Sequence, residues 1–184
     1  MNETRHPLNI PNTLTIARLL AVVPVIYLSR TGQEPAAAAL FVVAMLTDCL
    51  DGWYAKRHGQ ETALGLYLDP VVDKIVILAL LYELAHTGRI DWVVSHLFLA
   101  RELLQNAVRN AAARQGQVVG ANWMGKTKAV LQTALVAWGL ALPALGNGLP
   151  GDALKVAAWL VLGVSWCFFA RFLWLNRSPF KEYP

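Results

Sequence analysis

Charged residues are scarce in this chain of 184 residues, where Asp, Glu, Lys and Arg together make up 15%. Soluble globular domains carry about 25% charged residues, so this shortage argues against an ordinary soluble domain. The hydrophobic fraction of 56% and the positive mean hydropathy of +0.42 point the same way. The composition therefore predicts a membrane protein.

Cysteine is also rare. Cys49 and Cys167 both fall inside apolar stretches, which excludes a disulfide framework and predicts free, buried thiols. Three of the histidines, His58, His86 and His96, fit no spacing typical of metal ligands, so we expect no histidine-based metal site. Internal repeats and low-complexity segments are absent too, and the length predicts a single domain over residues 1–184.

Basic residues give the chain a net charge of +4, but they do not form a stripe. They cluster at the ends of apolar segments instead, which excludes a typical nucleic-acid-binding surface. Basic residues so placed suit anionic lipid head groups and phosphorylated substrates. We therefore expect membrane lipids as partners and no nucleic acid.

Six apolar stretches are long enough to cross a bilayer, which takes about 20 residues in a helix. Glycine or small polar residues separate them, as expected of turns. We predict an all-α, polytopic membrane bundle of six transmembrane helices. The predicted spans are Ile10–Leu28, Pro35–Tyr54, Ala63–Ala85, Trp92–Ala113, Lys126–Leu145 and Leu154–Leu175.

Most Lys and Arg residues fall at the span ends that lie on the same side as the N-terminus. Only Arg30, Arg89 and Lys155 fall at the opposite ends. Because cytoplasmic ends carry the excess of positive charge, we predict that both termini are cytoplasmic, in a cell (plasma or inner) membrane. Arg18 and Lys74, like the deeper Arg101, remain at membrane depth and require partners there.

Four aspartates stand on two adjoining apolar stretches: Asp48 and Asp51, then Asp69 and Asp73. Spacings of three and four place both carboxylates of each pair on one helix face. Each unpaired carboxylate in a membrane costs roughly 2.5–3.5 kcal/mol, and only Lys74 lies close by in sequence. The four aspartates could be solvated carboxylates at helix ends. A shared site for magnesium, manganese or calcium is a simpler way to offset the cost of their charge.

The motif around these aspartates reads D-x-x-D-G-x-x-A-K-x8-G-x3-D-x3-D. It closely resembles the signature of the CDP-alcohol phosphotransferases, integral membrane enzymes that move a phosphatidyl group from CDP-diacylglycerol to an alcohol. The family usually has arginine where this chain has Lys56. Lysine retains the positive charge but lacks the planar fork of a guanidinium group.

This resemblance implies that two divalent cations, Mg²⁺ or Mn²⁺, bind to Asp48, Asp51, Asp69 and Asp73. Asp73 would also be the catalytic general base that acts on the attacking hydroxyl. The residues implied to hold the CDP end of the donor are Asn12, Thr15, Asp48, Asp51, Gly52, Ala55, Lys56, Gly65 and Asp69. From the residues alone, Asn12 and Thr15 could equally serve in helix capping, and Gly52 and Gly65 in helix packing.

A second set of motifs narrows the acceptor. Arg101-Glu102 with Arg109 eight residues later, and then Gly-Lys-x-Lys ahead of Gln132, resemble the bacterial phosphatidylglycerophosphate synthases. The resemblance implies that the acceptor is sn-glycerol 3-phosphate and that the enzyme is a homodimer. Its phosphate would bind to four basic residues, each of which could alone be a simple positive-inside residue: Arg101, Arg109, Lys126 and Lys128.

Two alternatives remain open. In the first, the same chemistry uses another acceptor, either phosphatidylglycerol in a cardiolipin-type synthase or an inositol phosphate. In the second, the chain is a metal-ion transporter that uses its intramembrane aspartates. A transporter is expected to carry charges along a path through both membrane halves, whereas here the aspartates gather at one end and the outer halves read as apolar.

Overall fold

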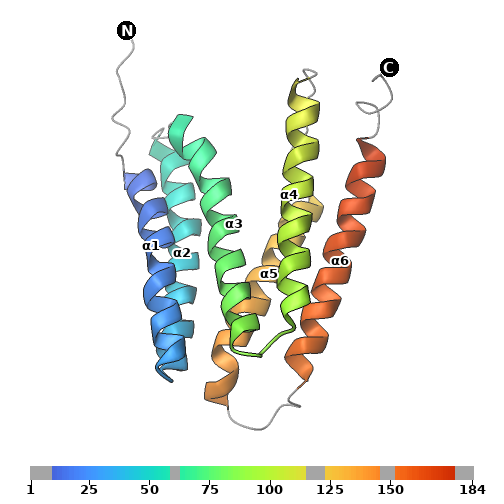
Figure 1. The fold of residues 1–184 in the computed structure, drawn as a ribbon. Helices are drawn as coiled ribbons and strands as arrows, with labels where there is room; N and C mark the ends of the chain where they lie inside the picture. Colours follow the sequence, from blue (N-terminus) through green and yellow to red (C-terminus); the bar gives the residue numbers. More distant parts are fainter. Residues whose placement is uncertain (1–9, 59–62, 115–122, 146–151, 177–184) are drawn as a thin grey trace.

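The structure, a computed structural model, describes residues 10–58, 63–114, 123–145 and 152–176. Side chains are described within these ranges except at 10–11, 48–64, 66–67 and 144–145. The elements are the helices α1 (Ile10–Arg30), α2 (Glu34–His58), α3 (Ala63–His86), α4 (Trp92–Arg114), α5 (Trp123–Ala141) and α6 (Ala153–Leu175), with a short 3₁₀ helix η1 (Leu142–Leu145) after α5 (Figure 1). The predicted all-α, six-helix fold is therefore confirmed.

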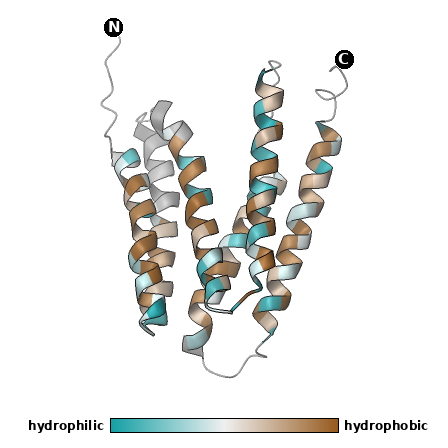
Figure 2. Ribbon diagram, viewed as in Figure 1, coloured by the Kyte–Doolittle hydropathy of each residue, from teal (hydrophilic) through white to brown (hydrophobic). Residues whose placement is uncertain are grey.

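Two of the described helices are long and apolar enough to cross a membrane by length and composition alone, at Asn12–Arg30 and Ala153–Leu175. Glu34–Thr47, the part of α2 with described side chains, is apolar but shorter than a span. Hydrophilic residues interrupt α3 and α4, and α4 carries them along much of its length (Figure 2). Several of these interior polar residues of α4 are buried, including Arg101, Glu102 and Gln105. Such residues lower the apparent hydropathy of a helix but, when buried and paired, are compatible with a bundle interior.

The bundle consists of two groups of three helices. In the first, α1 packs against both α2 and α3; in the second, α6 packs against both α4 and α5. Contacts of α3 with α4 and α5, and of α2 with α5, join the groups. Figure 1 shows that α1 begins and α6 ends at the same end of the bundle.

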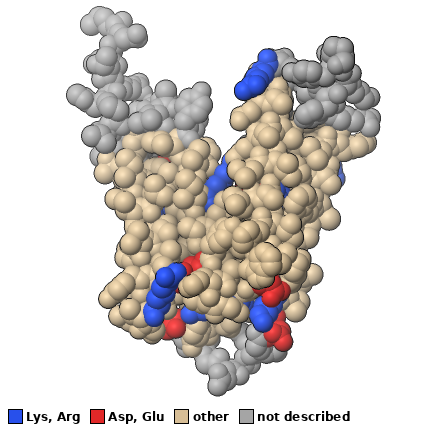
Figure 3. Space-filling view, viewed as in Figure 1, with Lys and Arg blue, Asp and Glu red and all other residues tan. Residues whose placement is uncertain are grey.

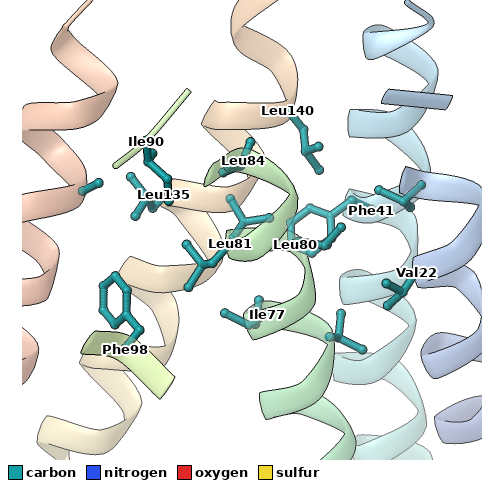
Figure 4. Close-up of a cluster of buried hydrophobic side chains, with 14 of the residues drawn as sticks. Val22, Phe41, Ile77, Leu80, Leu81, Leu84, Ile90, Phe98, Leu135 and Leu140 are labelled. Atoms are coloured by element: carbon teal, nitrogen blue, oxygen red, sulfur yellow. The ribbon is translucent and has the colours of Figure 1, made fainter. Parts of the chain in front are cut away.

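The apolar core is centred on α3, whose buried residues recur at helical spacing and contact both groups of helices. Leu80, Leu81 and Leu84 are fully buried between Phe41 of α2 and Leu140 of α5 (Figure 4). Burying a leucine side chain contributes roughly 1.5–3 kcal/mol, so this layer contributes much of the packing energy between the groups. The layer lies further along α3 than Asp69 and Asp73, nearer the C-terminal end of that helix. The apolar core and the polar region therefore occupy different levels of the bundle.

Two helix ends form where the sequence places glycine. Gly32 follows α1 with φ +77° and Gly88 follows α3 with φ +71°, a left-handed conformation that glycine adopts without strain. After each glycine the next backbone N–H donates back to the helix, from Gln33 to the Leu28 carbonyl and from Arg89 to the Leu84 carbonyl, both at 2.9 Å. These are Schellman-type caps, and they confirm the turns predicted at both places.

The fifth helix ends before Leu145, four residues earlier than predicted, because Pro143 has no backbone N–H to donate to the carbonyl of Gly139. Arg89 takes the place of that missing donor, since its Nη1 lies 3.1 Å from the Gly139 oxygen. The chain continues as η1. An arginine from the turn before α4 thus completes the end of α5.

Charges are also present at the end of the bundle opposite the aspartates, so the expectation of apolar outer halves is wrong there. Arg30 donates two hydrogen bonds to the buried Glu83, at 2.9 and 2.7 Å, and Arg89 lies 3.6 Å from Glu34. Figure 3 shows acidic and basic atoms close together at this end. These pairs join α1 to α3 and the turn before α4 to α2.

Cys167 is a free thiol, as predicted, but it is exposed and not buried. It lies on a face of α6 that turns away from the bundle, between the buried Ser165 and Phe169. Cys49 lies outside the described side chains.

Gly139 of α5 packs against Leu84 of α3 and Leu154 of α6, and substitution there is expected to destabilise the fold. A Cβ added at Gly139 would lie 2.5 Å from Leu84 Cδ1 and 3.3 Å from a methyl group of Leu154. We expect Gly139→Ala to cost about 1–3 kcal/mol through overpacking. Gly163→Ala is the matched control, because nothing lies within 4 Å of that position. Thermal midpoints of both variants in detergent measure the difference, and equal midpoints would contradict the packing described.

Candidate active site

The polar region begins with paired side chains between α1 and α3. Thr15 Oγ1 donates to Asp69 Oδ1 at 2.6 Å, and one turn further Arg18 Nη1 donates to Asp73 Oδ1 at 2.8 Å. Thr15 and Arg18 are buried, while the Asp73 side chain is 40% exposed. Because the spacings 15/18 and 69/73 match one helical turn on each helix, the two pairs form successive rungs. They fix Asp73 with its carboxylate open on one side.

The remaining predicted donor residues are less completely described. Asn12 is buried on the face of α1 that also carries Thr15, and Gly65 is buried in the first turn of α3. The backbone places the other members of the motif in the last part of α2, and their side chains lie outside the described residues: Asp48, Asp51, Gly52, Ala55 and Lys56.

A cleft with basic walls opens beside Asp73, between α3, α4 and α5. We call it the cationic cleft; it has a volume of about 370 Å³. Figure 3 shows basic atoms within the hollow that divides the viewed face. The charged residues that line the cleft are Asp73, Lys74, Glu102, Arg109, Lys126 and Lys128. Four basic groups against two acidic ones leave it with an excess of positive charge.

A second space, of about 160 Å³, adjoins the cationic cleft and extends along α5. We call it the α3–α5 cavity. It shares Asp73, Lys74 and Lys128 with the cleft, and then continues to Gln132 and Thr133. Asp73 therefore stands where the two spaces meet.

Glu102 is the centre of a buried charge cluster between α4 and α5. It accepts hydrogen bonds from Lys128 Nζ and, at 2.9 Å, from Arg101 Nη1. Lys74 is held separately, 2.7 Å from Asn106 Oδ1. Buried charges in a low-dielectric interior require such pairing. The cluster holds Lys128 at the wall that both spaces share.

The structure separates the two arginines that the sequence analysis placed together. Arg109 lines the cationic cleft, whereas Arg101 is only 2% exposed and lines neither space, because Glu102 and the Phe169 ring of α6 cover it. The expected direct contact of Arg101 with an acceptor phosphate therefore has no support in this geometry. Through Glu102, Arg101 is positioned to orient Lys128 instead.

The last helix contributes aromatic faces to this region, although its sequence carries no recognisable motif. The guanidinium carbons of Arg101 and Arg109 each lie 5.8 Å from a ring centroid, over Phe169 and Phe172 respectively. Cation–π contacts of this kind attract and orient a guanidinium group. α6 thus forms a supporting wall behind α4.

Three further polar residues of the site were not assigned a role from the sequence. Arg18 pairs with Asp73, and Lys74 and Gln105 line the cationic cleft. In the sequence, Arg18 and Lys74 stand out by their position at membrane depth, where a charged side chain needs a partner or a function. Gln105 follows Glu102 by three residues and therefore faces the same side of α4.

Comparison with known proteins decides the family. A family model for CDP-alcohol phosphatidyltransferases matches residues 8–170. This chain belongs to the CDP-alcohol phosphatidyltransferase family. It is 36% identical over 162 residues to the CDP-diacylglycerol–glycerol-3-phosphate 3-phosphatidyltransferase of Escherichia coli strain K12, covering 84% of this chain and 89% of that protein. The enzyme of that name from Shigella flexneri serotype 5b matches to the same extent.

A solved structure shares the fold. The phosphatidylinositol phosphate synthase of Mycobacterium tuberculosis, crystallised with CDP-DAG bound, aligns with a TM-score of 0.67 at 21% identity. The alignment covers 95% of this chain and 89% of that chain. The helical architecture of this CDP-alcohol phosphatidyltransferase is thus that of a membrane protein, as its composition predicts.

Membership of the CDP-alcohol phosphatidyltransferase family implies metal-dependent chemistry. Among the described residues, no group of three or more potential ligands gathers. The described part of the motif nevertheless supplies two carboxylates one turn apart, Asp69 and Asp73, and the backbone of α2 carries two more. Such an all-oxygen donor set fits a hard divalent cation.

Proposed function

We propose that this protein transfers a phosphatidyl group from CDP-diacylglycerol to sn-glycerol 3-phosphate, giving phosphatidylglycerophosphate and CMP. The observation that carries the proposal is the cationic cleft beside Asp73 in a chain whose relatives bear the name of this activity. The cleft offers an anionic acceptor a place next to the carboxylate that would activate it. The reaction belongs to phospholipid biosynthesis and takes place at the membrane.

The charge of the cleft favours a phosphorylated acceptor. Its basic residues can hold a phosphate dianion, Arg109 through paired N–H groups and the lysines as point charges. An uncharged alcohol would leave the excess positive charge of the cleft without a counter-ion. The phosphodiester of phosphatidylglycerol carries a single negative charge, whereas a phosphate monoester carries close to two. The cleft therefore favours a monoester such as glycerol 3-phosphate over phosphatidylglycerol. Inositol phosphate is also a monoester, so the acceptor must be decided by assay.

For the donor, we propose that the CDP moiety lies at the ends of α1, α2 and α3 that carry the aspartates. Asn12, Thr15 and Gly65 would contact it, together with the motif residues of α2 named above. Thr15 already positions Asp69 through its hydroxyl. When bound by the four aspartates, two divalent cations, Mg²⁺ or Mn²⁺, would neutralise charge on the diphosphate and on the transferring phosphoryl group.

Asp73 is proposed as the general base. It would accept the proton of the acceptor hydroxyl, whose oxygen then attacks the phosphorus attached to diacylglycerol, while the bond from that phosphorus to CMP breaks. Arg18, 2.8 Å from the other side of the carboxylate, fixes the direction in which Asp73 faces. The Asp73 side chain is 40% exposed and lines both spaces, so the acceptor can reach it.

The same considerations extend to the setting of the enzyme. We infer that the aspartate end faces the cytoplasm of a cell membrane, with both termini on that side, because most Lys and Arg residues flank that end. Residues 1–184 would form one domain, and the protein would act as a homodimer, as the family resemblance implies.

Arg109→Ala is expected to raise the KM for glycerol 3-phosphate by roughly one to two orders of magnitude and to change the KM for CDP-diacylglycerol little. The reason is the loss of a charge-assisted phosphate contact, worth roughly 1.5–3 kcal/mol. Arg109→Lys should restore the affinity only partly, because the guanidinium fork is lost. Initial rates at varied concentrations of each substrate give the two values. An effect confined to the donor KM would place the acceptor elsewhere.

An acceptor screen tests the proposed function as a whole. Purified protein is supplied with CDP-diacylglycerol and magnesium, and CMP release is followed with each candidate acceptor separately. Glycerol 3-phosphate is expected to support turnover. Glycerol and phosphatidylglycerol are expected to release no CMP. If only inositol phosphate or phosphatidylglycerol releases CMP, the acceptor is wrong although the chemistry stands.

A further inference from the structure

Gln132 is a buried polar residue that the interactions described above do not use. It is 4% exposed on α5, and its side chain lines the α3–α5 cavity. Buried side-chain amides in folded proteins are normally hydrogen-bonded, because their desolvation is costly otherwise. The amide lines the α3–α5 cavity, so a partner for it can enter from that space.

The position of Gln132 relates it to the acceptor. It follows Lys128 by four residues and therefore lies on the same face of α5, one turn deeper. Asp73, Lys74 and Lys128 line the same cavity and also the cationic cleft. A small molecule with its phosphate among the basic groups and its reacting hydroxyl at Asp73 would extend into the space that Gln132 lines.

We infer that Gln132 is a specificity-determining residue that binds the free, non-reacting hydroxyl of a polyol phosphate acceptor. This inference rests on the proposed function and extends it, because it says how the acceptor is told apart from a simpler alkyl phosphate. An amide can both donate to and accept from a hydroxyl, which makes glutamine suited to an alcohol. A site built to hydrogen-bond such a hydroxyl discriminates against an analogue that lacks it.

The apolar walls of the cavity strengthen this assignment. Met45, Ile77 and Leu78 line it together with the polar groups. Few polar groups, set in an apolar wall, give a small-molecule site its orientation and selectivity. Lys74 is held by Asn106 and Lys128 by Glu102, which leaves Gln132 and its neighbour Thr133 as the uncharged polar side chains of the wall. Of the two, Gln132 lies one helical turn from Lys128, on the same face of α5.

The test compares two acceptors that differ by one hydroxyl, glycerol 3-phosphate and 3-hydroxypropyl phosphate. We expect wild-type kcat/KM to favour glycerol 3-phosphate by roughly 10-fold. Gln132→Met, which keeps the volume and removes the amide, should bring that ratio close to one by lowering kcat/KM for glycerol 3-phosphate alone. Gln132→Asn, which keeps an amide, should retain part of the preference. Gln33→Met makes the same chemical change at an exposed position before α2, outside both spaces, and should leave the ratio at the wild-type value.

The outcomes separate this inference from the proposed function. If the wild type turns over glycerol 3-phosphate but uses both acceptors equally well, Gln132 does not bind the non-reacting hydroxyl and the inference is wrong. The inference also fails if Gln132→Met slows both acceptors equally, because that is the signature of a structural role. A wild-type enzyme that uses neither acceptor would instead overturn the proposed function. If Gln132→Met does not fold, the wild-type ratio and that of Gln132→Asn decide the matter.

Discussion

A folded Asp73→Asn variant is expected to lose turnover by at least roughly 10²–10⁴-fold, the usual contribution of a general base. Asparagine keeps the shape of the side chain and can still contact Arg18, but it cannot accept the proton of the acceptor hydroxyl. Loss of a metal ligand would add to the effect. The variant should nevertheless retain part of its binding to CDP-diacylglycerol, because Thr15 and Asp69 remain paired.

Two measurements make this prediction specific. CMP release reports turnover, and binding of CDP-diacylglycerol to the purified variant reports the donor site. Asp152→Asn is a matched control, since that carboxylate is 84% exposed ahead of α6, in the turn that leads into it. Near-normal CMP release by folded Asp73→Asn protein would remove Asp73 from the mechanism.

Chelation of divalent cations is expected to abolish activity, and added magnesium or manganese should restore it. Asp73 has Arg18 as a partner, but Asp69 accepts from the neutral hydroxyl of Thr15, so its charge is not offset by that contact. The diphosphate of the donor adds further negative charge at the same place. Hard oxygen ligands and phosphate oxygens together favour divalent cations of this kind.

The chelation experiment needs a control for effects of the chelator itself. EDTA already saturated with magnesium should leave CMP release unchanged, whereas excess free EDTA should stop it. Full activity in excess EDTA would refute a divalent cation at the aspartates. It would leave the fold and the family of the protein untouched.

Much of the fold follows from local sequence. Apolar runs of about 20 residues, separated by glycine and small polar residues, predicted six helices that the structure confirms with small shifts at their ends. The four-residue shift at the end of α5, near Pro143, depends on a partner that local sequence does not identify, since Arg89 supplies the hydrogen bond that the proline lacks. The spacing of the aspartates and glycines also predicted the family correctly.

Other features depend on which helices are neighbours, and sequence spacing does not give this. Arg18 and Asp73 are 55 residues apart, and only the packing of α1 on α3 brings them together. Arg101 and Arg109 share a face of α4, but Phe169 and Glu102 cover the first while the second reaches the cleft. Periodicity predicts the face of a side chain, and the packed neighbour decides whether that face is open.

The assignment of the remaining site residues stays a prediction. The carboxylates of Asp48 and Asp51 lie outside the described side chains, so their approach to Asp69 and Asp73 rests on the motif. Lys126 and Lys128 line the cleft as predicted for an acceptor site, and their contact with phosphate is for the acceptor assays to establish.

The central claim is that the cleft selects glycerol 3-phosphate as the acceptor of the phosphatidyl group. A competition experiment tests it most directly. Glycerol 3-phosphate, inositol phosphate and phosphatidylglycerol are supplied together at equal concentration with CDP-diacylglycerol, and the lipid products are identified by mass spectrometry. The result predicted is phosphatidylglycerophosphate as the main product, with one CMP released for each molecule formed. Cardiolipin or phosphatidylinositol phosphate as the main product would contradict the claim.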